Sequence, residues 1–181
     1  MSQRRFFKLF LKQPSVNAAV TPSSKKAAIG MVRGLDLSKM KYVVELGPGT
    51  GVFTDILAKR LPANCKILLI ELEEEFINPL EKRLDDRFEV VKCSACNLSS
   101  LLKDRGINNV DLVISGLPYT LPSEVKKTLF ATLLELTRNG THMRWFTYFP
   151  FFMKKHYSNF PMKKTCFVLW NFPPMWIYSV N

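Results

Sequence analysis

The chain has 181 residues, of which 47% are hydrophobic and 23% are charged, which fits one domain with a core and excludes a disordered protein. Its formal net charge of +11 requires an anionic partner or surface. Lys8 and Lys12 interrupt the early apolar stretch, which argues against a signal peptide, and the uncharged run 165–181 is too short for a transmembrane helix.

The first 34 residues are predicted to form a basic helical region, with helices over 2–13 and 23–34, followed by a domain spanning residues 35–181. At about 100° per residue, segment 4–12 separates its cations from its apolar side chains. The cations are Arg4, Arg5, Lys8 and Lys12, and the apolar residues are Phe6, Phe7, Leu9, Phe10 and Leu11. This pattern is typical of a helix lying on an anionic membrane, and the alternative is a terminal helix packed on the domain.

The charges are unevenly distributed along the chain. All 15 acidic residues lie between Asp36 and Glu135, whereas residues 1–35 carry seven cations and residues 136–181 carry six. Of the four cysteines, Cys93 and Cys96 have CxxC spacing but no second ligand pair, which favours reduced thiols over a metal site. The sequence therefore predicts a cytoplasmic protein without metal, bound peripherally to the inner face of the cell membrane.

Apolar runs and helical patterns alternate after residue 40. Strands are predicted at 41–45, 66–71, 88–92, 111–115, 142–148, 166–170 and 176–180, and helices at 52–61, 74–84 and 123–137. This alternation favours a mainly parallel, Rossmann-like α/β sheet with helices on both faces. The last two strands leave no room for a helix between them, so they are predicted to form an antiparallel hairpin.

A glycine-rich turn follows the first predicted strand. Its glycines permit positive φ and let a ligand approach the backbone. Glu71 ends the next strand, where a carboxylate can accept hydrogen bonds from both ribose hydroxyls of a nucleotide cofactor. This order of elements fits NAD as well as S-adenosylmethionine, but the E-x-G-x-G-x-G form is the methyltransferase version. The residues assigned to S-adenosylmethionine in the turn are Glu45, Gly47, Gly49, Thr50 and Gly51.

Two further strand ends are assigned to the same crevice. Ser94 and Ala95 follow the third strand, where methyltransferases usually carry an Asp that bonds the adenine amino group; the neutral Ser94 makes a weaker bond. Ser115 ends the fourth strand and is also assigned to the cofactor.

The fourth strand continues into Gly116-Leu117-Pro118-Tyr119. A polar-Pro-aromatic motif here is typical of amino-methyltransferases, whose backbone carbonyls accept amine hydrogens and whose ring faces the developing cation. Gly116 and Leu117 are predicted to supply the carbonyls, and Tyr119 the ring. The alternative is an ordinary tight turn after a strand.

The chain resembles the bacterial phospholipid N-methyltransferase family, the soluble and peripheral phosphatidylethanolamine methyltransferases. The matching pieces occur in the family's order over most of the chain and lie at 20–24, 45–54, 115–118, 121–122, 146–148 and 167–174. The resemblance implies a class I methyltransferase that uses S-adenosylmethionine to methylate a lipid amine, from phosphatidylethanolamine towards phosphatidylcholine. Tyr119 and Tyr148 are the polar groups expected nearest the crevice, and we assign them to orienting the amine, because a Tyr hydroxyl is a poor base at neutral pH.

The chain departs from that family at four positions. Ser94 and Asn97 replace acids, Trp145 stands where a polar residue is common, and Tyr119 is aromatic as in the rRNA adenine dimethyltransferases. These departures leave the identity of the lipid headgroup open, with ornithine lipid among the candidates.

The main alternative is an enzyme resembling the rRNA adenine N6-methyltransferases, because basic ends and a Leu-Pro-Tyr motif also suit RNA. Gly116, where those enzymes carry Asn or Asp, and the amphipathic segment 4–12 favour the lipid. Methylation of a small molecule leaves the basic ends unexplained, and only Ser94 favours a non-enzymatic lipid-binding module. The aromatic stretch 149–155 is predicted to form a second membrane contact or a wall of a lipid entry.

Overall fold

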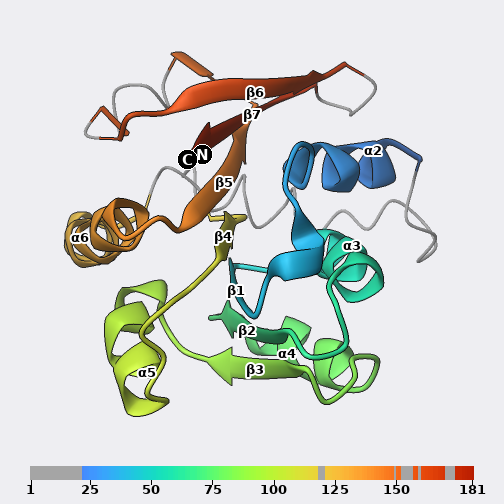
Figure 1. Ribbon diagram of the computed structural model, residues 1–181, viewed down its shortest axis with the longest axis vertical. Coiled ribbons are helices and arrows are strands. Elements are labelled where there is room, and N and C mark those ends of the chain that lie inside the picture. The colour runs from blue at the N-terminus through green and yellow to red at the C-terminus, as the bar shows by residue number, and fades with distance from the viewer. Residues whose placement is uncertain (1–21, 118–120, 149, 152–156, 159, 170–173) are drawn as a thin grey trace.

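Strands and helices alternate along the chain in the computed structural model, which describes residues 22–117, 121–148, 150–151, 157–158, 160–169 and 174–181 (Figure 1). The strands are β1 (Tyr42–Leu46), β2 (Lys66–Glu71), β3 (Phe88–Lys92), β4 (Leu112–Ser115), β5 (His142–Thr147), β6 (Lys163–Val168) and β7 (Met175–Val180). The helices are α2 (Pro22–Met31), α3 (Val52–Arg60), α4 (Glu74–Glu81), α5 (Leu98–Asp104) and α6 (Ser123–Arg138), with short 3-10 turns η1 (Leu37–Lys39) and η2 (Ala95–Asn97).

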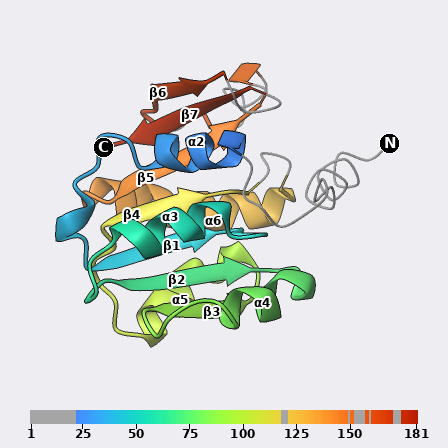
Figure 2. The ribbon, with the colours of Figure 1, turned by 90° about the vertical axis from the view of Figure 1, so that its right-hand side faces the viewer.

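The seven strands form one sheet in the order β3-β2-β1-β4-β5-β7-β6. The first five strands of that order are parallel, and β7 pairs antiparallel with both β5 and β6. Helices cover both faces of the sheet (Figure 2). Because β1 is buried on both faces, its sequence is apolar at successive positions rather than at alternating ones, and Glu45 is the exception. The predicted fold, including the antiparallel hairpin at the carboxyl end, is confirmed.

Two apolar cores lie on the two sides of the sheet. On one side, α5 and α6 pack on residues such as Leu68 and Val113, and on the other, α2 and α3 pack on residues such as Leu69 and Ile114. Trp145 belongs to the first core, where its ring stacks 5.3 Å from the ring of Tyr157. Its burial gives a packing reason for an aromatic residue at this position of β5.

Three predicted elements differ from the structure by three residues at one end, whereas the bounds of the other predicted elements after residue 40 agree within one residue. The helix expected at 74–84 ends at Glu81, and the one expected at 23–34 ends at Met31, ahead of Gly34 with its φ of 77°. β6 lies at 163–168 rather than 166–170, because Lys163 and Lys164 face outward on an edge strand and hide its pattern.

One helix, α5, has no counterpart in the sequence prediction. The helix predicted over 2–13 lies outside the described residues, and the domain boundary at residue 34 stays a prediction. Within the described part of the chain, no helix combines the length and the apolar character needed to cross a bilayer.

Candidate cofactor and acceptor site

The carboxyl ends of the parallel strands meet at one edge of the sheet, and the predicted site residues follow those ends. Gly47, Gly49 and Gly51, in the turn from β1 to α3, have φ angles of 68°, 54° and 81°, which only glycine adopts readily. The amide of Gly47 donates to the carbonyl of Ile70 on β2 at 2.9 Å. Thr50 lies between the glycines and is exposed. The turn therefore has a fixed conformation that side chains at its glycines would disturb.

The loop after β4 lies directly against this glycine turn. The amide of Gly116 donates to the carbonyl of Leu46 at 2.8 Å, and a Cβ added at position 116 would lie 2.6 Å from the carbonyl oxygen of Gly47. The side chain of Leu117 covers Gly47, and buried Ser115 accepts the Leu117 amide at 3.4 Å. Gly116 therefore has a steric role: a side chain there would push the β1 turn out of place.

Glu71, at the end of β2, ties the turn to its neighbour. One carboxylate oxygen accepts the Gly49 amide at 2.9 Å, and the other accepts the amides of Leu72 at 2.7 Å and Glu73 at 3.0 Å. These three bonds hold the carboxylate at the sheet edge beside the glycine turn. An anionic acceptor fixed at this place is the arrangement required to bind a pair of ribose hydroxyls.

Glu45 is completely buried beneath the turn. Its Oε2 accepts the hydroxyl of Thr54 on α3 at 2.8 Å, whereas its Oε1 has no partner among the described residues. Burial raises the pKa of Glu45 to about 8. A buried polar atom without a partner is costly, so its presence indicates a site for a ligand group that would satisfy it.

Ser94 and Ala95 lie beside the end of β2, because the Cys93 amide donates to the Glu71 carbonyl at 3.0 Å. Ala95 is buried, and the Ser94 hydroxyl accepts the Cys96 thiol at 3.2 Å. The structure therefore brings the residue assigned to adenine next to the carboxylate assigned to ribose. Over the described residues, no group of three or more His, Cys, Asp or Glu is arranged to hold a metal ion.

Tyr148 follows β5 at the same edge of the sheet. Its half-buried ring packs edge-on against Phe146 with centroids 5.5 Å apart, and Phe146 packs on Phe53 of α3 at 5.4 Å. The ring is therefore held by the core on the α3 side. Tyr119 lies within residues 118–120, outside the described part of the chain, so its assignment stays a prediction.

Arg83 is a site residue that the sequence analysis missed. From the turn after α4, its Nη2 donates to the Thr50 carbonyl at 2.7 Å, and its Nη1 lies 3.3 Å from a carboxylate oxygen of Asp55. A Cβ added at Gly51 would collide with the Arg83 guanidinium. Arg83 therefore clamps the glycine turn from outside, across 33 positions in sequence, and no local motif signals such a contact.

We expect Arg83→Ala to weaken S-adenosylmethionine binding roughly fivefold to tenfold, because a bond from a charged donor contributes about 1–2 kcal/mol when partly exposed. Calorimetric titration measures the dissociation constant. Lys82→Ala is the matched control, since Lys82 is an exposed cation at the same helix end. Equal affinities for the two variants would show that the clamp has no effect on the turn.

Taken together, the residues present fit S-adenosylmethionine. Three glycines leave backbone open to a ligand, Glu71 offers a fixed carboxylate, and Glu45 has a buried oxygen that lacks a partner. The loop after β4 and Tyr148 border the same edge, where an acceptor nucleophile would meet a bound methyl donor.

Residues 23–158 match the family described as "Ribosomal RNA adenine dimethylase". The chain is 30% identical over 177 residues to an ornithine lipid N-methyltransferase of Singulisphaera acidiphila. The aligned region covers 96% of this chain and 92% of that protein. The chain is also 32% identical over 94 residues to a ribosomal RNA small subunit methyltransferase A of Cupriavidus metallidurans. This aligned region covers 52% of this chain and 32% of that protein.

Among solved structures, Aeropyrum pernix fibrillarin in complex with S-adenosyl-L-methionine matches 87% of this chain and 76% of its own with a TM-score of 0.63. The sequence identity is 14%, so this similarity supports the fold alone.

Proposed function

Because the chain belongs to the ribosomal RNA adenine dimethylase family and is an S-adenosylmethionine-dependent N-methyltransferase, we propose that its acceptor is the amino headgroup of a membrane lipid. The observation that carries this proposal is the extent of the lipid-enzyme match, which covers 96% of this chain. The match to the ribosomal RNA enzyme of Cupriavidus metallidurans covers 52% of this chain, and the chain spans 32% of that protein's length.

The site supports methylation of an amine in the following way. When bound, S-adenosylmethionine supplies an electrophilic methyl group on a sulfonium. The chain's part is to position the donor and to offer polar groups to the acceptor, because methyl transfer is an in-line displacement. The backbone after β4 borders the site through Gly116 and Leu117, whose carbonyls we assign to the amine hydrogens, and Tyr148 lies at the adjoining end of β5. The lone pair of the neutral amine nitrogen would form the new bond to the methyl carbon as the carbon–sulfur bond breaks and its electron pair stays on sulfur, and the resulting ammonium would lose one proton to water.

The headgroup is the finer part of the proposal. The lipid-modifying relative is named for ornithine lipid, and phosphatidylethanolamine is the other candidate because it too offers a primary amine. We further propose that the enzyme acts from the inner face of the cell membrane, with the basic amphipathic segment 4–12 on anionic lipid.

Transfer of labelled methyl groups from S-adenosylmethionine tests this proposal. Anionic vesicles containing either ornithine lipid or phosphatidylethanolamine are offered to the full chain and to a form lacking residues 1–13. We expect label in one of the two aminolipids and at least a tenfold lower rate after truncation, because loss of a cationic anchor weakens membrane binding. Label in neither aminolipid would end the proposal.

The second candidate function is methylation of adenine in ribosomal RNA. It is favoured by the family match and by the concentration of cations at both ends of the chain. The same assay with structured RNA as acceptor distinguishes the two, since label in RNA and none in lipid would select this candidate.

A further inference from the structure

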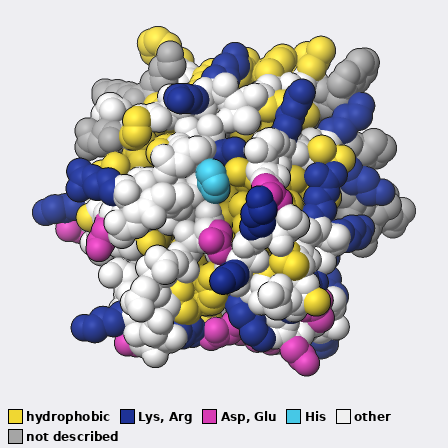
Figure 3. Space-filling view, viewed as in Figure 1, with side chains coloured by type: hydrophobic (Ala, Val, Ile, Leu, Met, Phe, Trp, Pro, Cys, Tyr) yellow, Lys and Arg dark blue, Asp and Glu magenta, His cyan; other side chains and the backbone are white. Residues whose placement is uncertain are grey.

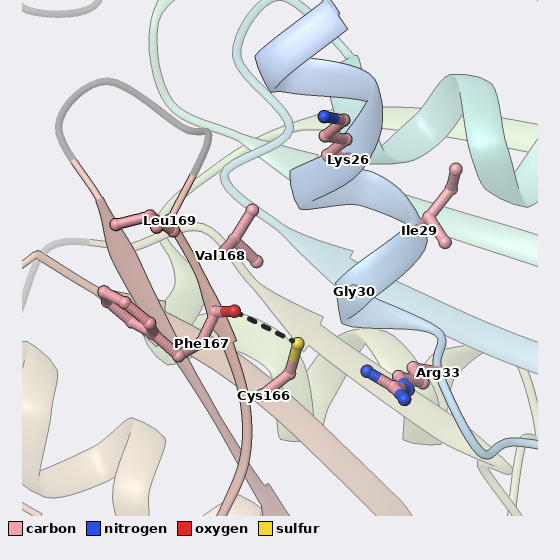
Figure 4. Close-up of a pocket in the computed structure, with 8 residues that line it drawn as sticks. All are labelled: Lys26, Ile29, Gly30, Arg33, Cys166, Phe167, Val168 and Leu169. Atoms are coloured by element: carbon pink, nitrogen blue, oxygen red, sulfur yellow. Dashed lines mark hydrogen bonds between the residues drawn. The ribbon is translucent and has the colours of Figure 1, made fainter.

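A groove of about 470 Å³ lies between α2 and the edge strand β6, away from the candidate site (Figure 4). Its α2 side is formed by Lys26, Ile29, Gly30 and Arg33, and its β6 side by residues 166–169. None of these residues has a part in the methyl-transfer site described above. The groove therefore calls for a separate explanation.

Gly30 sets the distance between the two walls. A Cβ added at Gly30 would lie 2.6 Å from Cδ1 of Ile177 and 3.2 Å from Cγ2 of Val168, so the helix packs on the hairpin through its bare backbone. Ile29, beside this contact, stays 44% exposed, and Leu169, which follows β6, stays 59% exposed. Apolar side chains this exposed on both rims of one groove are suited to an apolar ligand.

Both charged residues that line the groove are cations. Lys26 and Arg33 line it, and Lys163 and Lys164 lie on β6. Residues 1–35 and 136–181 contain no acidic residue. In the part of the chain that is described, no carboxylate forms an ion pair with Arg33 or Lys163. The upper part of Figure 3, over β6 and β7, shows cations and apolar side chains, whereas acidic side chains gather lower down.

The groove also reaches the same edge of the sheet as the methyl-transfer site. β5 and β6 both pair antiparallel with β7, so they run in the same direction. Val168 and Leu169 therefore lie towards the edge where β5 ends beside Tyr148. A ligand at that end of the groove would lie on the side of the molecule where the acceptor must enter.

We propose that the α2–β6 groove binds an anionic phospholipid of the membrane, with acyl carbons against Ile29 and Leu169 and the phosphate near Lys26 and Arg33. Charge favours this occupant over the chain's own segment 4–12, whose four cations would face cations of the groove. The inference deepens the proposed function and rests on it for the presence of a membrane. Binding here would turn the acceptor side of the site towards the bilayer.

Vesicle flotation of the full chain tests the groove, with phosphatidylcholine vesicles alone or with added phosphatidylglycerol. The variant Lys26→Gln/Arg33→Gln is expected to bind anionic vesicles about 30-fold more weakly, because each cation near such a surface contributes about 1 kcal/mol and 1.4 kcal/mol is tenfold. Lys103→Gln/Lys127→Gln is the matched control, since both lysines are exposed on α5 and α6, which pack on the opposite side of the sheet. We expect its binding to change less than about twofold.

The apolar rim is tested by Ile29→Ser/Leu169→Ser, in the full chain and without residues 1–13. Weaker vesicle binding in both backgrounds supports a lipid in the groove, whereas an effect that disappears on truncation means that residues 1–13 occupy it and overturns the inference. The inference would also be overturned if the groove variant Lys26→Gln/Arg33→Gln and the control variant Lys103→Gln/Lys127→Gln lost vesicle binding equally. It would be overturned as well if the groove variant lost binding to RNA and kept its binding to vesicles.

Methylation of an aminolipid dispersed in detergent separates the two proposals. If both hold, Lys26→Gln/Arg33→Gln methylates dispersed lipid at the wild-type rate while binding vesicles weakly. If neither the wild type nor any variant methylates an aminolipid, but Lys26→Gln/Arg33→Gln still binds vesicles more weakly, the proposed function fails. The inference that the groove binds a phospholipid then stands.

Discussion

Gly116→Ala is expected to weaken S-adenosylmethionine binding roughly 10- to 100-fold, since overpacking a tight contact costs about 1–3 kcal/mol. The added Cβ would lie 2.6 Å from the carbonyl oxygen of Gly47, which is backbone and cannot rotate away. Either the β1 turn or the β4 loop must move, and both border the cofactor site. Calorimetric titration with S-adenosylmethionine measures the effect.

Gly140→Ala is the control for the loss of a glycine as such. Gly140 precedes β5 at the opposite edge of the sheet, has a φ of 95°, and a Cβ there would meet nothing within 4 Å. Its replacement is expected to lower the melting temperature through backbone strain and to leave cofactor affinity unchanged. Wild-type affinity in Gly116→Ala would show that the two loops separate easily and that the glycine has no steric role.

The sequence predicts elements well where a strand is buried on both faces. The prediction matched β2 residue for residue, because this strand is largely a buried apolar run. The prediction also matched β3, although that strand lies at the sheet edge and is only partly buried. It misplaced β6, whose first residues are lysines at an exposed edge, and it missed α5, a helix of seven residues that begins Leu98-Ser99-Ser100. Serine has only moderate helix propensity, and so short a helix depends on packing rather than on pattern.

The candidate site shows the same division between local and tertiary information. The glycines of the β1 turn and Glu71 can be assigned from spacing, because strand, turn and helix follow one another along the chain. The Arg83 bond to Thr50 and the contact of Gly116 with Gly47 join segments that are distant in sequence. Contacts of this kind follow from the sheet order, which brings β4 beside β1, and not from any motif.

Glu45→Gln is expected to remove most of the pH dependence of stability near neutrality. Below about pH 4.5, Glu45 is protonated in both the folded and the unfolded chain, so the free energy of unfolding does not depend on its ionisation there. Between that pH and about 8, the unfolded chain loses the proton and the folded chain keeps it, because burial raises the pKa of Glu45 to about 8. Stability therefore falls as the pH rises through this window, by an amount on the order of 5 kcal/mol.

Urea denaturation across this pH window measures the effect. Glutamine at position 45 keeps the shape of the protonated acid and cannot ionise, so the variant is expected to be more stable than wild type at about pH 8 and similar at about pH 5. Glu75→Gln makes the same substitution at an exposed position of α4 and serves as the control. Parallel pH profiles for wild type and Glu45→Gln would show that this carboxyl is ionised throughout.

The same proton links stability to cofactor binding. S-adenosylmethionine carries positive charge, so a ligand at the free oxygen of Glu45 should favour the ionised carboxylate and release its proton on binding. Affinity is then expected to rise with pH up to about 8 and to level off above it. Titrations in buffers of different ionisation enthalpy measure the released proton directly, and Glu45→Gln should release none while binding the cofactor more weakly. A stable variant with poor affinity would mean that the wild-type chain retains a destabilising buried acid because the cofactor needs it.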